Sequence, residues 1–192
     1  MKKFLFIVLG LLIIGAGVFF YTQNTNSKNV LSTKKTLVAY FSATGVTKQV
    51  AENLSKATDS DVYEIKPVTK YTSDDLNWRD NNSRSYVEMH AEKSRPEIVD
   101  DGFSIDNYET IFLGFPIWWG TAPVIVHTFL EKYDLSNKKI IIFATSGSSG
   151  LGETSNNLKK SVPDSTEIVD GKILNGNPSV EELKAWVETL EK

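Results

Sequence analysis

The stretch Val38–Leu54, VAYFSATGVTKQVAENL, joins a strand pattern to a helix pattern through a short turn rich in hydroxyl groups. At the start of this stretch, residues 36–41 have the apolar pattern of a buried strand. Residues 46–57, at its end, carry apolar residues at helical spacing. Between them, 42–47 supply three hydroxyl side chains, one glycine and the backbone N–H groups of a helix start. This turn suits the many acceptor oxygens of a phosphate, although serine and threonine also serve as ordinary helix caps.

Strand and helix patterns continue to alternate along the rest of the chain. Further strands are expected at 61–67, 110–116, 139–145 and 166–174, and further helices at 123–133, 151–160 and 179–192. The runs at 110–116 and 139–145 are short and intensely apolar, which is typical of central strands covered on both faces. Five strands that alternate with helices predict an α/β fold with a doubly wound parallel sheet.

The segment 68–108 interrupts this alternation because it is long, polar and without a clear period. A loop of this size in a compact domain usually carries function or a short helix of its own. We expect a helix near 82–92, followed by an extended Arg95-Pro96. Trp78 and Tyr86 of this insertion either pack it against the sheet or help to shield a ligand.

The N-terminal residues have the pattern of a membrane segment. Lys2 and Lys3 precede an uncharged run, Phe4–Tyr21, which as a helix would span about 27 Å of a ~30 Å hydrocarbon core. We favour an uncleaved transmembrane signal anchor over a cleaved signal peptide. Cleavage after the small residues 15–17 would leave the apolar residues 18–21 as a poor N-terminus for a mature protein. The two lysines predict a single-pass membrane protein whose remaining chain lies outside the cytoplasmic membrane, or a secreted domain if the segment is cleaved.

Composition limits the remaining possibilities. The chain has 192 residues, a net charge of −3 and no cysteine. Disulfides, thiolate metal sites and cysteine nucleophiles are therefore excluded, and neither nucleic acid nor metal is expected as a partner. We expect three parts: a transmembrane signal anchor or signal peptide at 1–21, a polar linker at 22–35 and one folded domain at 36–192.

Three loops are expected at one edge of the sheet, because ligands of doubly wound folds bind beyond the carboxyl ends of the strands. The first is the hydroxyl-rich turn. The second, 116–123 (PIWWGTAP), exposes two tryptophans, as a partner surface or as a wall for a flat aromatic ligand. The third, 145–152 (TSGSSGLG), is nearly free of bulky side chains, so it is either a flexible loop or a close approach of backbone to a planar polar ring.

With these loops in this order, the chain resembles the flavodoxin family from about Thr36 to the C-terminus. FSATGVT is similar to the family's phosphate loop, usually written T/S-x-T-G-x-T, while GFPIWWGTAP and TSGSSG resemble the two loops that hold the isoalloxazine ring of FMN. RSYVEM and SRPEI, inside the insertion, are similar to a subgroup of flavodoxin-like proteins. Val46 departs from the family, since many members have asparagine there, and so does the apolar N-terminal segment.

The resemblance implies a flavodoxin-like sheet with strand order 2-1-3-4-5, preceded by one N-terminal apolar helix, and non-covalently bound FMN. The cofactor-binding residues that it implies are Ser42, Ala43, Thr44, Gly45, Val46, Thr47, Pro116, Ile117, Trp118, Trp119, Gly120, Thr145, Ser146, Gly147 and Ser148. No catalytic side chain and no metal ligand are assigned.

The function that follows is FMN-dependent electron transfer or oxidoreduction by a membrane-tethered domain outside the cytoplasmic membrane. Because the chain has no G-x-G-x-x-G fingerprint for a nicotinamide cofactor, we expect a redox partner protein or a membrane quinol as electron donor. Two alternatives stay open. One is an NAD(P)H:quinone-type flavin reductase, and the other is a cofactor-free binding module on the same fold.

Overall fold

The computed structural model describes residues 35–91 and 93–190. The predicted apolar helix at 1–21, and the linker up to residue 34, lie outside these residues. Within the two described ranges, no helix is both long and apolar enough to cross a bilayer. The first described residues, from Lys35, form a strand, so Lys35 belongs to the sheet and not to the linker predicted at 22–35.

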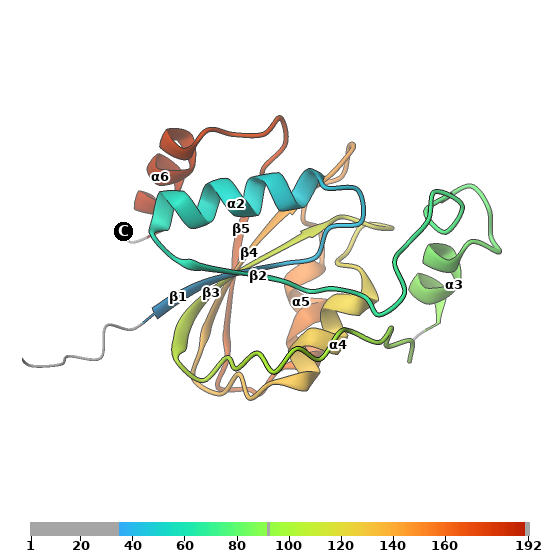
Figure 1. The fold of residues 1–192 in the computed structure, drawn as a ribbon, viewed down its shortest axis with the longest axis horizontal. Coiled ribbons are helices and arrows are strands. Elements are labelled where there is room, and N and C mark those ends of the chain that lie inside the picture. Colours follow the sequence, from blue (N-terminus) through green and yellow to red (C-terminus); the bar gives the residue numbers. More distant parts are fainter. Residues whose placement is uncertain (1–34, 92, 191–192) are drawn as a thin grey trace, which may run out of the picture. The chain divides into compact units, whose positions relative to one another are not determined.

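Five parallel strands form one sheet in the order β2-β1-β3-β4-β5, which confirms the predicted order (Figure 1). The chain moves outward from β1 to β2 and then returns to the other side of β1, so the direction of winding changes between β1 and β3. Ligands of doubly wound folds bind beyond such a change of direction. The strands are β1 (Lys35–Tyr40), β2 (Asp61–Glu64), β3 (Tyr108–Pro116), β4 (Lys139–Thr145) and β5 (Glu167–Ile173).

Helices cover both faces of this sheet (Figure 1). One face carries α2 (Val46–Thr58) and α6 (Val180–Glu188), and the other carries α4 (Val124–Lys132) and α5 (Thr154–Leu158), which a 3₁₀ turn at Lys159–Ser161 extends. Each face has its own buried apolar cluster, because successive residues of a strand point to opposite sides. Leu37, for example, joins the cluster with Phe129, while Val38 joins the cluster with Leu54.

Strand β2 is shorter than predicted, because the chain leaves the sheet after Ile65, whose N–H still donates to the Tyr40 carbonyl at 2.7 Å. Pro67, which has no N–H to offer a ladder, pairs instead with Ile98 in a single antiparallel bridge. Hydrogen bonds from Val68 N to Glu97 O and from Val99 N to Lys66 O, at 3.0 and 2.8 Å, flank this bridge. They close the neck of the insertion.

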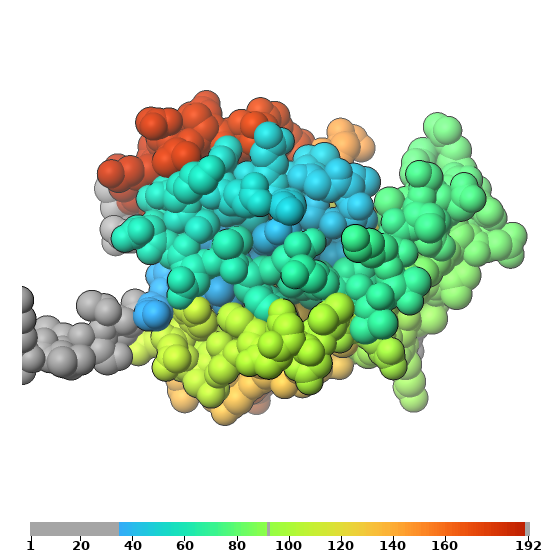
Figure 2. All heavy atoms as spheres, viewed as in Figure 1, coloured from blue at the N-terminus to red at the C-terminus, as the bar shows by residue number. Residues whose placement is uncertain are grey.

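The insertion folds around the helix α3 (Arg84–His90), which is shorter than the predicted 82–92. It begins where the Ser83 hydroxyl accepts a hydrogen bond from Tyr86 N. Arg84 holds Glu88 at 2.6 Å and lies 4.1 Å from the ring centre of Tyr71, whose hydroxyl also donates to Glu88. The insertion projects as a lobe next to the carboxyl ends of the strands (Figure 2).

Candidate functional site

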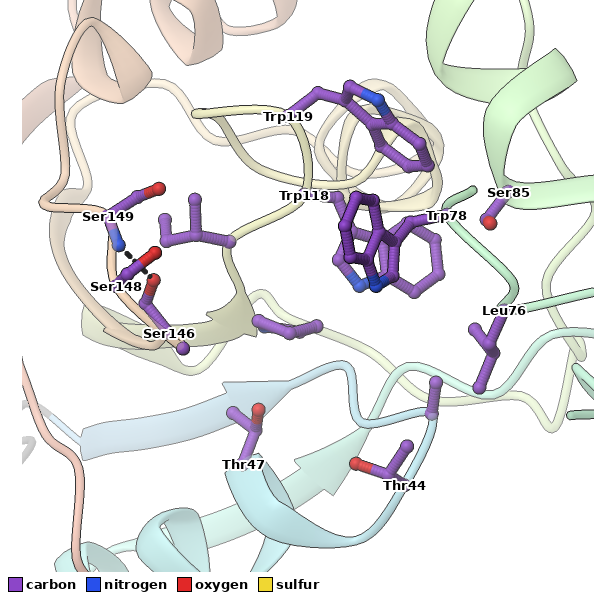
Figure 3. A pocket seen from close by; sticks show the side chains of 14 residues that line it. Thr44, Thr47, Leu76, Trp78, Ser85, Trp118, Trp119, Ser146, Ser148 and Ser149 are labelled. Atoms are coloured by element: carbon purple, nitrogen blue, oxygen red, sulfur yellow. Dashed lines mark hydrogen bonds between the residues drawn. The ribbon is translucent and has the colours of Figure 1, made fainter. Parts of the chain in front are cut away.

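A pocket of about 510 Å³ lies where the loops after β1, β3 and β4 meet the insertion. This volume is in the usual range for small-molecule sites. No ionisable side chain of the described residues lines the pocket. The lining residues are Ala43, Thr44, Thr47, Leu76, Trp78, Ser85, Pro116, Ile117, Trp118, Trp119, Ser146, Gly147, Ser148 and Ser149. In Figure 3, three of the serines face Leu76 and Ser85 across the pocket, and the two threonines close another side.

The phosphate-type loop at the start of α2 is held in a conformation that requires glycine. Gly45 has φ 88°, and its N–H donates to the Ser42 hydroxyl at 3.1 Å. The first bond of the helix runs from Gln49 N to Gly45 O, and no side chain of the described residues caps this end. The N–H groups of 46–48 therefore remain available to an anion, which the helix dipole also attracts.

A buried pair of hydroxyls connects this loop to the end of β4. Thr47 Oγ1 and Thr145 Oγ1 lie 2.8 Å apart, and both side chains are almost fully buried. Thr47 lines the pocket, whereas Thr145 does not. The pair fixes the distance between the first and third loops, so a ligand that touches both meets walls already in place.

The tryptophan loop turns sharply at Trp119 and Gly120. Trp118 N donates to Thr121 O at 2.9 Å and Thr121 N donates back at 3.0 Å, so only two residues form the turn. Both have positive φ, 45° and 79°, as in a type I′ turn. Asparagine or aspartate usually precedes the glycine of such a turn, so a tryptophan there carries backbone strain.

The two tryptophans have different surroundings. Trp118 is partly buried and packs edge-on against Phe41 and Tyr71, with ring centres 5.6 and 5.4 Å away. Trp119 is 41% exposed, and its ring lies edge-on to the stacked pair Tyr86 and His90 of α3. Tyr86 therefore supports the tryptophan loop but does not itself line the pocket.

The serine loop is fixed by a residue beyond β5. Asn175 accepts a hydrogen bond from Ser146 N at 2.9 Å and donates one to Ser146 O at 2.7 Å. Ser149 N donates to the Ser146 hydroxyl at 2.9 Å, as the dashed line in Figure 3 marks. This loop is thus more ordered than its glycine content suggests. Ser149 lies in the loop predicted at 145–152, although it was not among the cofactor-binding residues implied by the resemblance, and Asn175 was not singled out by the sequence.

The insertion supplies the remaining wall through Leu76, Trp78 and Ser85. Trp78 is 63% exposed, and the guanidinium of Arg79 lies 4.6 Å from its ring centre. Behind this wall, burial and the hydrogen bond to Glu88 raise the pKa of Tyr71 far above its usual value. Its hydroxyl therefore stays protonated and remains a donor. Sequence reasoning missed Leu76 and Ser85, because neither lies in a loop that directly follows a strand.

Most of the residues singled out from the sequence come together at this pocket. Five of them do not line it: Ser42, Gly45, Val46, Gly120 and Thr145. Ser42, Gly45 and Thr145 shape the walls through the bonds described above, and Gly120 completes the tight turn. Val46 is 54% exposed. Among the residues that the structure describes, no group of three or more histidine and carboxylate side chains could hold a metal ion.

Comparisons with known proteins agree with this geometry. A family profile described as Flavodoxin matches residues 35–190. A structure from Bacteroides uniformis, provisionally assigned as a flavoprotein, is 46% identical with a TM-score of 0.76, over 81% of this chain and 98% of that one. A similarly assigned protein of Bacteroides eggerthii is 43% identical, with a TM-score of 0.76 over 82% and 98%.

A more distant structure, a flavoprotein of Lactobacillus acidophilus in complex with FMN, is 24% identical with a TM-score of 0.60. The match covers 80% of this chain and 99% of that one. At this identity the likeness concerns the fold. None of the curated proteins matches the chain.

Proposed function

Because the chain belongs to the flavodoxin family, we propose that it binds FMN non-covalently in this pocket and works in electron transfer or oxidoreduction. The observation that carries the proposal is a pocket with an aromatic wall beside the start of α2, where no side chain of the described residues caps the helix or brings an ionisable group into the lining. Bound flavin supplies the transfer of one or two electrons, so no catalytic side chain is required.

The residues present fit the two ends of FMN. The N–H groups at the start of α2, with the hydroxyl of Thr44, would hold the phosphate through dipoles without a countercharge. The flat ring would lie between the tryptophan loop and the serine loop, where Ile117 and Trp118 offer apolar surface and Gly147 lets the backbone come close. These walls would also keep water from much of the ring.

The binding test uses the full chain, purified in a mild detergent and mixed with FMN. After removal of excess FMN, resolved flavin absorption bands and quenched fluorescence are expected. Thr44→Ala should weaken FMN at least about tenfold, as for the loss of a hydrogen bond to a charged group, and should leave riboflavin unchanged because riboflavin has no phosphate. Thr69→Ala, at an exposed threonine outside the pocket, is the matched control.

The same test separates this proposal from a cofactor-free binding module. A wild-type chain that stays colourless with both FMN and riboflavin would contradict the proposal. The tryptophan loop would then be studied as a protein-binding surface, since Trp119 and Trp78 are both exposed and both line the same pocket.

We also propose, from the sequence, that residues 1–21 tether this domain to the outer side of the cytoplasmic membrane. Support comes from Lys2 and Lys3 before the apolar run, and a redox partner protein or a membrane quinol is the electron donor that fits this position. Anaerobic mixing of the FMN-loaded chain with a quinol or with NADPH tests the donor. Rapid reduction by NADPH would favour the NAD(P)H:quinone-type reductase instead.

A further inference from the structure

The hydroxyl of Ser85 is buried against the pocket without a partner. The residue is 2% exposed, lines the pocket, and its Oγ makes no hydrogen bond to any of the described residues. Figure 3 shows this hydroxyl on the insertion side, across the pocket from Ser146 and Ser148. A buried hydroxyl that is left unpaired costs free energy, so such groups call for an explanation. A ligand atom in the pocket would supply the missing partner.

The backbone around Ser85 is held firmly, so the hydroxyl keeps its place. Ser85 N donates to Asp75 O at 2.9 Å, and Asp75 is itself fixed by Thr72, whose N–H and hydroxyl donate to its carboxylate at 2.8 and 2.9 Å. These two hydrogen bonds also lower the pKa of Asp75. Arg84 donates to Thr69 O at 2.7 Å. Such support from surrounding residues is what a preorganised ligand contact needs.

Trp78 provides an independent observation on the same wall. A largely exposed tryptophan is unusual, yet this one lines the pocket and carries Arg79 over its ring. The guanidinium covers one face of the indole, so a ligand would stack on the opposite face. Because no ionisable side chain in the described part of the chain lines the pocket, that ligand is expected to be uncharged where it meets Trp78 and Ser85.

We propose that the insertion is a second ring-binding wall, in which Ser85 hydrogen-bonds to, and Trp78 stacks on, a flat conjugated ring. The ring is uncharged and carries a carbonyl oxygen or ring nitrogen that pairs with the hydroxyl. This inference rests on the proposed function in one respect, because the flavin ring of FMN is one of two ligands that could supply such a ring. The other source is a second flat carbonyl compound that enters beside the cofactor.

The experiment compares Ser85→Ala and Trp78→Leu with the wild-type full chain in detergent. Ser73→Ala is the matched control, since Ser73 is an exposed serine of the same insertion and does not line the pocket. In the first arm, FMN and riboflavin are titrated into unloaded protein. In the second, 1,4-naphthoquinone binding to the oxidised FMN-loaded chain is measured by equilibrium dialysis, where no electron can be transferred.

If the flavin ring is the partner, each variant lowers the affinity for FMN and the affinity for riboflavin by the same factor, at least about fivefold. If a second ring is the partner, flavin affinity is unchanged and naphthoquinone binds at least about fivefold more weakly. Variants that bind all three ligands like the wild type would overturn the proposal. Should the wild type bind no flavin, the proposed function fails, and the second arm on the unloaded chain still tests this inference.

Thermal unfolding distinguishes a ligand contact from a structural role of Ser85. Without ligand, Ser85→Ala should melt at the wild-type temperature or higher, because it removes an unsatisfied buried hydroxyl. With saturating ligand, its gain in melting temperature should be smaller than that of the wild type. A lower melting temperature without ligand would mean that the hydroxyl has a protein partner, and it would contradict the inference.

Discussion

Replacing Gly45 by alanine tests whether the left-handed backbone at the start of α2 builds the phosphate end of the pocket. A Cβ at Gly45 would meet no atom of the described residues within 4 Å, so the substitution has no steric cost beyond the backbone. At φ 88° an L-residue pays about 1–2 kcal/mol, partly offset by the about 0.4–1 kcal/mol that alanine gains from a stiffer unfolded chain. The net loss is about 1 kcal/mol.

Two other glycines make this measurement specific. Gly102 has φ 76° and equally open surroundings but lies outside the pocket, so Gly102→Ala should lose the same stability and keep the wild-type affinity for FMN. Gly150 also has open surroundings and no positive φ, so alanine there should stabilise slightly.

Thermal unfolding and ligand titration are the assays. A loss of about 1 kcal/mol should lower the melting temperature of a domain of this size by about 2–4 °C. Gly45→Ala should in addition weaken FMN more than riboflavin, because the loop relaxes away from the geometry that presents its N–H groups. If Gly45→Ala melts with the wild type and binds FMN equally well, the reasoning about this loop is wrong.

Three further changes probe the sheet, the insertion and the buried histidine. Gly114→Ala should cost about 3 kcal/mol in urea unfolding, because its Cβ would lie 2.2 Å from Cζ of the buried Phe143 ring; unchanged stability would refute this packing. Tyr71→Phe removes the donor to Glu88, so α3 should exchange its amide hydrogens faster while the sheet does not; equal exchange throughout would argue against that anchor. Burial and nearby cations lower the pKa of His127, so the folded state binds fewer protons than the unfolded one. Stability should therefore fall as the pH drops below about 6.5. Between pH 7.5 and 5.5, the urea midpoint of His127→Gln should fall less than the urea midpoint of the wild type.

The parts of the site that follow strands were predictable because their signals are local. An apolar run ends, and hydroxyls, tryptophans or glycines follow it at once, as at Ser42, Trp118 and Ser146. Parallel strands bring these ends to one edge whatever the rest of the chain does. The same local reasoning placed the strands and helices and missed mainly where they end, whereas the strand order was implied by the resemblance to the flavodoxin family.

Trp78 was named from the sequence as a residue that packs the insertion or shields a ligand, but the rest of the insertion wall was not predictable in this way. Ser85 reaches the pocket because Tyr71 and Glu88 anchor α3 and because Asp75 accepts its N–H, and these are contacts between distant positions that no period or spacing reveals. The tight turn at Trp119 escaped for a different reason. Its sequence is Trp-Gly, whereas the usual signal for such a turn is Asn-Gly or Asp-Gly.

The closed neck of the insertion, where Pro67 meets Ile98, lies between two parts of the domain whose opening free energies we expect to differ. The lobe beyond the neck is joined to the body mainly through side chains, such as Trp119 against Tyr86, and not through the hydrogen-bond ladder of the sheet. We therefore expect it to open locally while the five strands stay intact, as a cooperative unit with a smaller opening free energy than the sheet. The rate at which ligands enter and leave the pocket would then depend on opening of the lobe, while the unfolding rate of the domain would depend on the sheet.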